Sequence, residues 1–185
     1  MCGNIINISP LSFYQVNTIQ AEKLYNKAIE YLSLNKNDIV ADLYCGAGTI
    51  GLSMAHLVKK IIGVEIVPQA IQNAKINTLN NHISNAEFFC GDAGEILHNL
   101  KIKNSSTNII VIDPPRKGCS VDTLNVIINS NPHKILMISC NPATAARDAK
   151  YLSQNGYYAE KIFGADLFPR TRHVETVCLM SKVEG

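Results

Sequence analysis

A thiol and several carboxylates fall where the strands of an α/β protein would end. Residues 135–139 form an apolar run that predicts a buried strand, and the run stops at Cys140, which an Asn-Pro pair follows. In an open α/β sheet, a cysteine at the carboxyl tip of a strand faces the ligand crevice. The alternative is a small hydrophobic residue that ends a strand, since cysteine is among the most buried residue types.

A glycine turn precedes this thiol in the chain. Residues 42–51 read Asp-Leu-Tyr-Cys-Gly-Ala-Gly-Thr-Ile-Gly, and their glycines match GxGxxG, a pattern that lets a ligand approach the backbone closely. Glu65 ends the next predicted strand, about 20 residues after the first glycine, where doubly wound folds place an acid for ribose hydroxyls. A surface acid at a strand end is the alternative for Glu65. The combination fits either a dinucleotide or S-adenosylmethionine.

Two more acids follow predicted strands. Asp92 comes after residues 86–90, where it would sit beside the adenine end of a nucleoside cofactor or remain an exposed loop carboxylate. Asp113 comes after residues 108–112 and begins the segment Asp-Pro-Pro-Arg-Lys-Gly. Two prolines stiffen that segment and hold Asp113 at the strand tip.

The elements that must position these groups alternate along the chain. The first helix, residues 18–32, has apolar side chains on one face, and Thr18 is suited to cap it. We expect further helices at residues 49–58, 68–80, 121–129 and 143–154, a short one before residue 103, and strands at 38–44, 60–66, 86–90, 108–112, 135–139, 158–163 and 174–181. This alternation predicts an α/β fold with a mostly parallel sheet and helices on both faces. Residues 1–185 would form a single domain, in which 1–33 are an extension and a helix.

Composition sets broad limits. The chain has 185 residues, 46% hydrophobic content and a net charge of +2, which neither demands nor excludes a polyanionic partner. Its six cysteines form no CxxC pair, which argues against a zinc ribbon, a thioredoxin-type site or a disulfide framework. No apolar run reaches membrane-spanning length and no signal peptide opens the chain, so we expect a soluble cytoplasmic protein.

Five motifs occur in order, at residues 14–17, 42–51, 113–118, 139–142 and 173–176. With them the chain resembles the catalytic domain of the RNA uracil-5-methyltransferases, and within that family the bacterial 23S ribosomal RNA branch. The resemblance implies a Rossmann-like, class I S-adenosylmethionine-dependent methyltransferase fold with seven strands. It also implies S-adenosylmethionine as cofactor, RNA as partner, a cytoplasmic monomer, and no contact with membranes.

The same resemblance assigns roles to residues. Cys140 would add to carbon 6 of uracil, and Glu175 would remove the proton from carbon 5 after methylation; an ion pair with Arg170 or Arg172 is the alternative for Glu175. The cofactor pocket would include Gln15, Tyr44, Gly46, Thr49, Glu65, Asp92 and Asp113, and the substrate would meet Asp113, Arg116 and Arg172. Thr49 departs from the family, which often has asparagine there, and could instead cap a helix.

Other functions are compatible with parts of the pattern. A transfer-RNA uracil methyltransferase shares the core motifs, and a cofactor-binding fragment without catalysis would keep the glycine turn. The hypothesis of an NAD-dependent oxidoreductase is supported by GxGxxG and Glu65 alone. A methyltransferase for exocyclic amines usually has an aromatic residue after the two prolines, where this chain has Arg116. Full-length relatives carry amino-terminal RNA-binding domains and often an iron–sulfur cluster; we expect neither the domains, the cluster nor another metal here.

Overall fold

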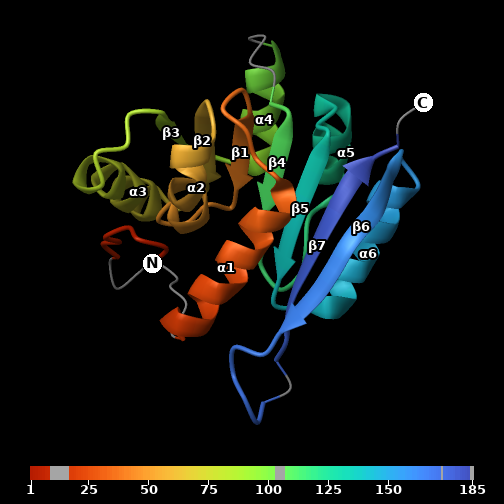
Figure 1. Cartoon of the computed structure of the whole chain (residues 1–185). Coiled ribbons are helices and arrows are strands. Elements are labelled where there is room, and N and C mark those ends of the chain that lie inside the picture. Colours follow the sequence, from red (N-terminus) through yellow and green to blue (C-terminus); the bar gives the residue numbers. More distant parts are fainter. Residues whose placement is uncertain (9–16, 103–106, 172, 184–185) are drawn as a thin grey trace.

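The protein is described by a computed structural model that covers residues 1–8, 17–102, 107–171 and 173–183 (Figure 1). Its strands are β1 (Ile39–Leu43), β2 (Lys60–Glu65), β3 (Ala86–Cys90), β4 (Ile109–Ile112), β5 (Lys134–Ser139), β6 (Tyr157–Ala165) and β7 (Glu175–Lys182). Its helices are α1 (Thr18–Leu32), α2 (Thr49–Met54), the 3₁₀ helix η1 (Ala55–Leu57), α3 (Pro68–Asn80), α4 (Ala93–Ile102), α5 (Val121–Ser130) and α6 (Pro142–Ser153). None of the helices described is long and apolar enough to cross a bilayer.

The seven strands form one mixed sheet in the order β3-β2-β1-β4-β5-β7-β6. The strands from β3 to β5 pair in parallel, whereas β7 is antiparallel to both β5 and β6. The predicted mostly parallel sheet is confirmed, but inserting β7 makes it differ from a purely parallel doubly wound sheet. Because β7 runs in the opposite direction, it begins at the edge where β5 ends, and Thr176 pairs with Ser139. This places Glu175 next to the tip of β5.

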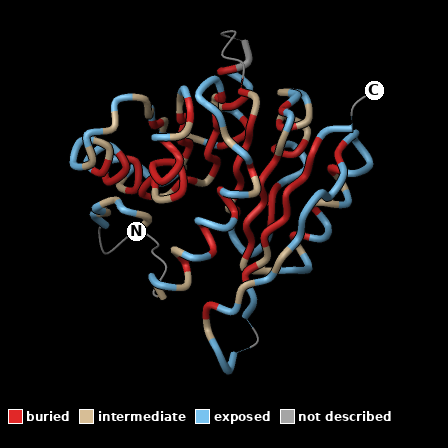
Figure 2. The backbone as a smooth tube through the Cα atoms, viewed as in Figure 1, coloured by how far each residue is buried: buried red, intermediate tan, exposed pale blue. Residues whose placement is uncertain are grey.

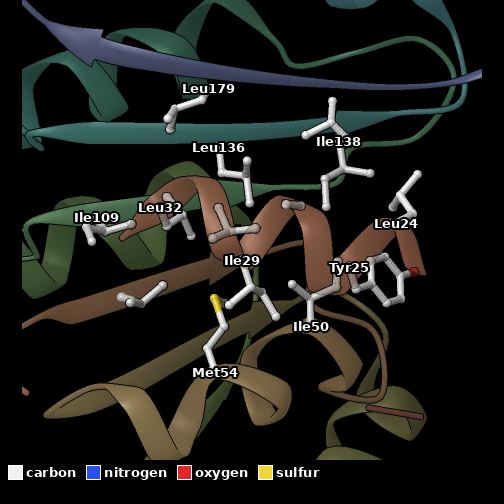
Figure 3. Close-up of a cluster of buried hydrophobic side chains, with 14 of the residues drawn as sticks. Leu24, Tyr25, Ile29, Leu32, Ile50, Met54, Ile109, Leu136, Ile138 and Leu179 are labelled. Carbon is white, nitrogen blue, oxygen red and sulfur yellow. The ribbon is translucent and has the colours of Figure 1, made fainter. Parts of the chain in front are cut away.

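Strand alternation divides the core into two layers. On one face, Val40 of β1 and Ile109 of β4 pack with α1 and α2, and on the other face their neighbours Ala41 and Ile110 pack with α4, α5 and α6. Figure 3 shows side chains of α1 and α2 meeting those of the sheet, with Leu136 among them. Figure 2 shows that burial is concentrated in the central strands and in the helix faces that cover them. The predicted helices on both faces of the sheet are confirmed.

The start of α1 differs from the expectation in one detail. Asn17, and not Thr18, is the N-cap: its side-chain oxygen accepts a hydrogen bond from the Gln20 amide at 3.3 Å. The Asn17 side-chain amide also donates to the Leu167 carbonyl at 2.8 Å. The cap therefore joins α1 to the segment between β6 and β7, and Thr18 is the first residue of the helix.

Residues 1–8 form no strand but lie against α3. The Asn81 side chain exchanges two hydrogen bonds with the backbone of Ile5, both 2.8 Å long. The Asn77 side-chain amide donates to the carbonyls of Asn7 and Ala47, at 3.1 and 3.0 Å. Buried Asn77 thus ties the amino-terminal segment to the glycine turn.

Candidate active site

A cavity of about 650 Å³ lies at the carboxyl edge of the parallel strands. Loops after β1, β2, β3, β4 and β5, together with the first residue of β7, contribute to its wall. Nine of the residues singled out in the sequence line it: Tyr44, Gly46, Thr49, Glu65, Asp92, Asp113, Arg116, Cys140 and Glu175. Two others, Gln15 and Arg172, lie outside the described residues. The structure thus collects groups that span 132 positions of sequence into one chamber.

Cys140 and Glu175 enter this cavity from paired strands. Cys140 is half-buried, whereas Glu175 is only 6% exposed. Burial raises the pKa of the Cys140 thiol, the Glu175 and Asp113 carboxylates raise it further, and the Arg116 guanidinium acts against them. Burial also raises the pKa of Glu175, so its carboxylate is a stronger base than an exposed one. Of the alternative ion pairs for Glu175, none joins it to Arg170 among the described residues, and Arg172 lies outside them.

A second thiol, Cys45, also lines the cavity but is poorly suited to act as a nucleophile. It is 7% exposed, and its thiol lies 3.8 Å from the Gly46 carbonyl, to which it donates. Burial raises its pKa well above the ordinary value, and the carboxylates of Asp42 and Glu65 raise it further. Since the thiolate is the reactive form, Cys140 with its nearby cation is the better nucleophile of the two.

Glu65 fixes the glycine turn to the end of β2. Its carboxylate accepts a hydrogen bond from the Gly46 amide at 3.1 Å and another from the Val67 amide at 2.9 Å. A carboxylate offers about four lone-pair sites. The two hydrogen bonds use two of these sites. The other two could accept from the two hydroxyl groups of a vicinal diol in the cavity.

Asp92 combines features of both interpretations made from the sequence. It is exposed, yet it lines the cavity and caps α4, with one oxygen accepting from the amides of Gly94 at 2.8 Å and Glu95 at 3.1 Å. The other carboxylate oxygen accepts no hydrogen bond within the part of the chain that the structure describes. The cap also fixes the side chain relative to the helix.

The Asp113 carboxyl group has a strongly raised pKa. Burial raises its pKa to about 8, and the nearby Glu175 and Asp42 carboxylates add to the shift. At neutral pH the group is therefore mostly protonated and can donate a hydrogen bond to a carbonyl in the cavity. Pro114 and Pro115 follow it in the wall and offer no competing amide donors.

Tyr44 occupies a strained position at the tip of β1. Its φ of 64° lies in the left-handed region, which residues other than glycine seldom adopt and which is concentrated at functional sites. Its hydroxyl interacts with the side chains of Thr123 and Cys119. The backbone then turns through Gly46 and Gly48 into α2, so Gly48 and not Thr49 is the N-cap.

Two hydroxyl groups in the cavity wall were not predicted from the sequence. Ser120 and Thr123 both line the wall, and their hydroxyl oxygens are 2.9 Å apart. Ser120 is the N-cap of α5, accepting from the Thr123 amide at 3.1 Å. A serine two residues after the Asp-Pro-Pro-Arg-Lys-Gly segment, at the start of a predicted helix, was the signal that could have found them, because helices that begin at this edge of the sheet present their first turn to the crevice.

Comparison with known proteins identifies the family. The chain matches the model of the tRNA (uracil-5-)-methyltransferase family over residues 6–183. It belongs to this family. The resemblance to the RNA uracil-5-methyltransferase family, inferred from the five ordered motifs, is thereby confirmed.

Relatives with similar sequences are also named as RNA methyltransferases. The chain is 48% identical to an uncharacterized RNA methyltransferase of Staphylococcus aureus over 181 residues, covering 98% of this chain and 40% of that protein. It is also 48% identical to one from Bacillus cereus over 177 residues, covering 96% of this chain and 38% of that protein. The chain therefore spans about two fifths of the length of these relatives.

A solved structure shares both fold and sequence. The Pyrococcus abyssi tRNA (uracil-54, C5)-methyltransferase in complex with S-adenosyl-L-homocysteine superposes with a TM-score of 0.79 and 30% identity, covering 95% of this chain and 41% of that one. A ribosomal RNA methylase from Streptococcus thermophilus, at 13% identity and a TM-score of 0.70, shares the fold; it covers 89% of this chain and 97% of that one. The methyltransferase fold expected from the sequence is confirmed at this level.

Proposed function

We propose that this chain is the catalytic part of an S-adenosylmethionine-dependent RNA uracil-5-methyltransferase, with Cys140 as nucleophile and Glu175 as general base. The observation that carries the proposal is the shared cavity. A half-buried thiol, a buried carboxylate and the Glu65–glycine turn all line one chamber of about 650 Å³. Family membership supports methyl transfer onto uracil as the reaction.

The residue types match the steps of this reaction. Carbon 5 of uracil is a poor nucleophile until the Cys140 thiolate adds to carbon 6 and converts the ring to an enolate. The neutral Asp113 carboxyl group would donate a hydrogen bond to a ring carbonyl and stabilise the enolate charge. When bound, S-adenosylmethionine would supply an electrophilic methyl group to carbon 5 and leave as S-adenosylhomocysteine. Glu175 then removes the carbon 5 proton, and the electron pair left behind expels the Cys140 thiolate and restores the ring.

The remaining cavity groups suit the nucleoside cofactor. In this proposal the carboxylate of Glu65 accepts from the ribose hydroxyls, Gly46 allows close approach, and Asp92 lies at the adenine end. Tyr44, Thr49 and Asp113 complete the pocket, and Gln15, outside the described residues, remains a prediction. An NAD-dependent oxidoreductase would use the same glycine turn but would not need the Cys140 and Glu175 pair.

RNA is the proposed substrate, with Arg116 and Arg172 as candidate contacts to it. The ordered motifs favour 23S ribosomal RNA. Transfer RNA is the second candidate, because the similar Pyrococcus abyssi enzyme acts on tRNA. Methylation of both transcripts with labelled cofactor, followed by mapping of the modified uridine, distinguishes them: label in carbon 5 of only one RNA selects that RNA.

The decisive experiment traps the covalent step. An RNA that contains 5-fluorouridine blocks the final elimination, because fluorine replaces the proton that Glu175 must remove. We expect a stable protein–RNA adduct whose cross-linked peptide contains Cys140. Cys140→Ala should abolish both adduct and methyl transfer while S-adenosylhomocysteine binds as before.

The exposed Cys90, at the end of β3, provides the matched control. Cys90→Ala should form the adduct at the parent rate. An adduct that persists in Cys140→Ala, or that maps to another thiol, would refute the assignment.

A further inference from the structure

The segment that carries Arg116 is held from one side by the first turns of α6. The side-chain amide of Asn141 donates to the Arg116 carbonyl at 3.0 Å. The Thr144 hydroxyl lies 3.3 Å from the same carbonyl and 3.1 Å from the Asn141 carbonyl, so its one proton is shared between the two acceptors. The backbone of Arg116 is therefore fixed to the helix that begins two residues after Cys140. Arg116 itself lines the cavity.

One turn further along, Arg147 and Asp148 hold the end of the same segment. The Arg147 guanidinium donates to the carbonyls of Lys117 at 3.0 Å and Cys119 at 3.1 Å. The Asp148 carboxylate accepts from the Cys119 amide at 2.8 Å and from Arg147 at 2.8 and 2.6 Å. Asp148 is only 1% exposed, so its charge is compensated by these bonds rather than by water.

Gly118 lets the segment fit against these two side chains. Its φ is +75°, and an added Cβ would lie 2.5 Å from the Arg147 guanidinium and 2.6 Å from the Asp148 carboxylate. No other residue type fits without displacing this contact. The close approach makes the helix and the segment one packed unit.

We infer that Arg147 and Asp148 are positioning residues: the α6 clamp, defined as Asn141, Thr144, Arg147 and Asp148, holds Arg116 at a fixed place beside Cys140. The same helix is joined directly to the nucleophile, so thiol and cation keep a constant relation. The clamp itself does not line the cavity. Its value for catalysis rests on the proposed function, but its effect on the thiol does not.

The charges around Cys140 determine what loosening the clamp does. Glu175 on β7 and Asp113 after β4 disfavour the thiolate, whereas Arg116 favours it. If Arg116 drifts away, the Glu175 carboxylate, joined by Asp113 once it ionises at higher pH, faces the thiol with no compensating cation from this segment. The thiol should then ionise at higher pH and react more slowly at a given pH.

The test measures the rate at which iodoacetamide alkylates Cys140 in the whole chain, by peptide mass spectrometry, from pH 6 to 10. Arg116→Met sets the scale of the effect. We expect Arg147→Met to lower the rate constant at pH 8 about threefold to tenfold, and Arg147→Lys to restore part of it. Lys150→Met, an exposed charge loss on the same helix, is the matched control and should follow the parent profile.

A double-mutant cycle separates positioning from general loosening. Because Arg147 acts through Arg116, Arg147→Met should add nothing in an Arg116→Met background. Thr144→Val, which removes one hydroxyl bond, should give a smaller shift in the same direction, and it decides the matter alone if Arg147→Met does not fold. Parent profiles in both clamp variants, or full additivity in the cycle, would overturn the inference. Loss of methyl transfer is not a readout here, so failure of the proposed function leaves this result interpretable.

Discussion

At the scale of single residues, environment separates side chains that are chemically alike. Cys45 and Cys140 line the same cavity, but Cys45 is closed off beside carboxylates and Cys140 is half-buried beside a guanidinium. Glu65 is occupied by two backbone amides, whereas burial in the cavity wall makes Glu175 a stronger base. Neither distinction can be drawn from residue type, because both depend on neighbours distant in sequence.

The proposed base leads to a specific kinetic prediction. In Glu175→Gln, Cys140 can still add to uracil and methylation can proceed, but the carbon 5 proton cannot be removed. We expect turnover to fall about 10²-fold to 10⁴-fold. A methylated protein–RNA adduct should accumulate even when the RNA contains ordinary uridine and no 5-fluorouridine. Denaturing gel electrophoresis with labelled RNA measures the adduct.

Glu160→Gln is the control for that experiment. Glu160 lies on the neighbouring strand β6 and accepts a hydrogen bond from the Ser181 hydroxyl at 2.5 Å, away from the cavity wall. It should turn over at the parent rate without accumulating adduct. If Glu175→Gln also turned over normally, Glu175 would not be the base.

A buried acid predicts how stability depends on pH. Asp42 is fully buried, with one oxygen accepting from the Gly51 amide at 2.8 Å and the other without a partner among the described residues. Burial raises its pKa from 3.8 to about 7, with Glu65 adding to the shift. Because the unfolded chain releases this proton at lower pH, the folded state loses stability as pH rises from about 4 to 7.

Asp42→Asn should remove that dependence. Between pH 5 and pH 8 we expect the variant to lose about 2 to 3 kcal/mol less unfolding free energy than the parent, measured by urea denaturation. Ser53→Ala, a buried substitution on α2 that removes no ionisable group, should shift stability equally at both pH values. Equal slopes for parent and Asp42→Asn would contradict the buried-acid account.

At the scale of elements, the sequence predicted most helices and strands within one or two residues. Apolar runs bounded by turn residues mark strands such as Ala86–Cys90, whose ends agree with the prediction. The helix expected over 49–58 instead ends as α2 at Met54 and continues as η1. The direction of β7 depends on pairing with strands distant in sequence, and the periodicity of apolar residues carries no information about that pairing. The sequence therefore predicted that Cys140 and Glu175 lie together only through the family resemblance.

Two glycines provide a matched test of how tightly α6 packs. Gly118 and Gly156 both have left-handed φ, at +75° and +89°, but an added Cβ at Gly156 meets nothing within 4 Å. Gly156→Ala should cost about 1 to 2 kcal/mol of unfolding free energy, the backbone penalty alone. Gly118→Ala should cost at least about 2 kcal/mol more, because it also displaces Arg147 and Asp148. Equal losses in denaturant titrations would show that the packing at Gly118 contributes nothing.

At the scale of the whole molecule, two hydrophobic layers hold the sheet rigid while polar groups gather at one edge. Every strand from β1 to β5 delivers a cavity residue through the loop at its carboxyl end, and antiparallel β7 delivers one at its start. The alternation of predicted strands and helices along the sequence had already indicated that these groups would gather at one edge of the sheet. A ligand that binds there contacts loops from most of the chain, so binding should stabilise the entire domain against unfolding.

Comparing this stabilisation between two ligands distinguishes the candidate cofactors. At a concentration 100 times its dissociation constant, a ligand that binds the folded state alone adds about 2.7 kcal/mol, which raises the melting temperature by roughly 5 to 10 °C for a domain of this size. We expect S-adenosylhomocysteine to produce this shift and NAD at the same concentration to produce none. A comparable shift with NAD would favour the oxidoreductase instead.

Glu65 then tests where the ligand sits. Glu65→Gln weakens the acceptor proposed for the ribose hydroxyls, so the S-adenosylhomocysteine dissociation constant should rise about tenfold or more. Glu87→Gln changes an exposed carboxylate of the adjacent strand β3, whose partner is Lys60 at 2.7 Å, and should leave the constant unchanged. If both variants bound with the parent affinity in calorimetry, the cofactor would not lie against the end of β2, and the arrangement of the cavity would have to be reassigned.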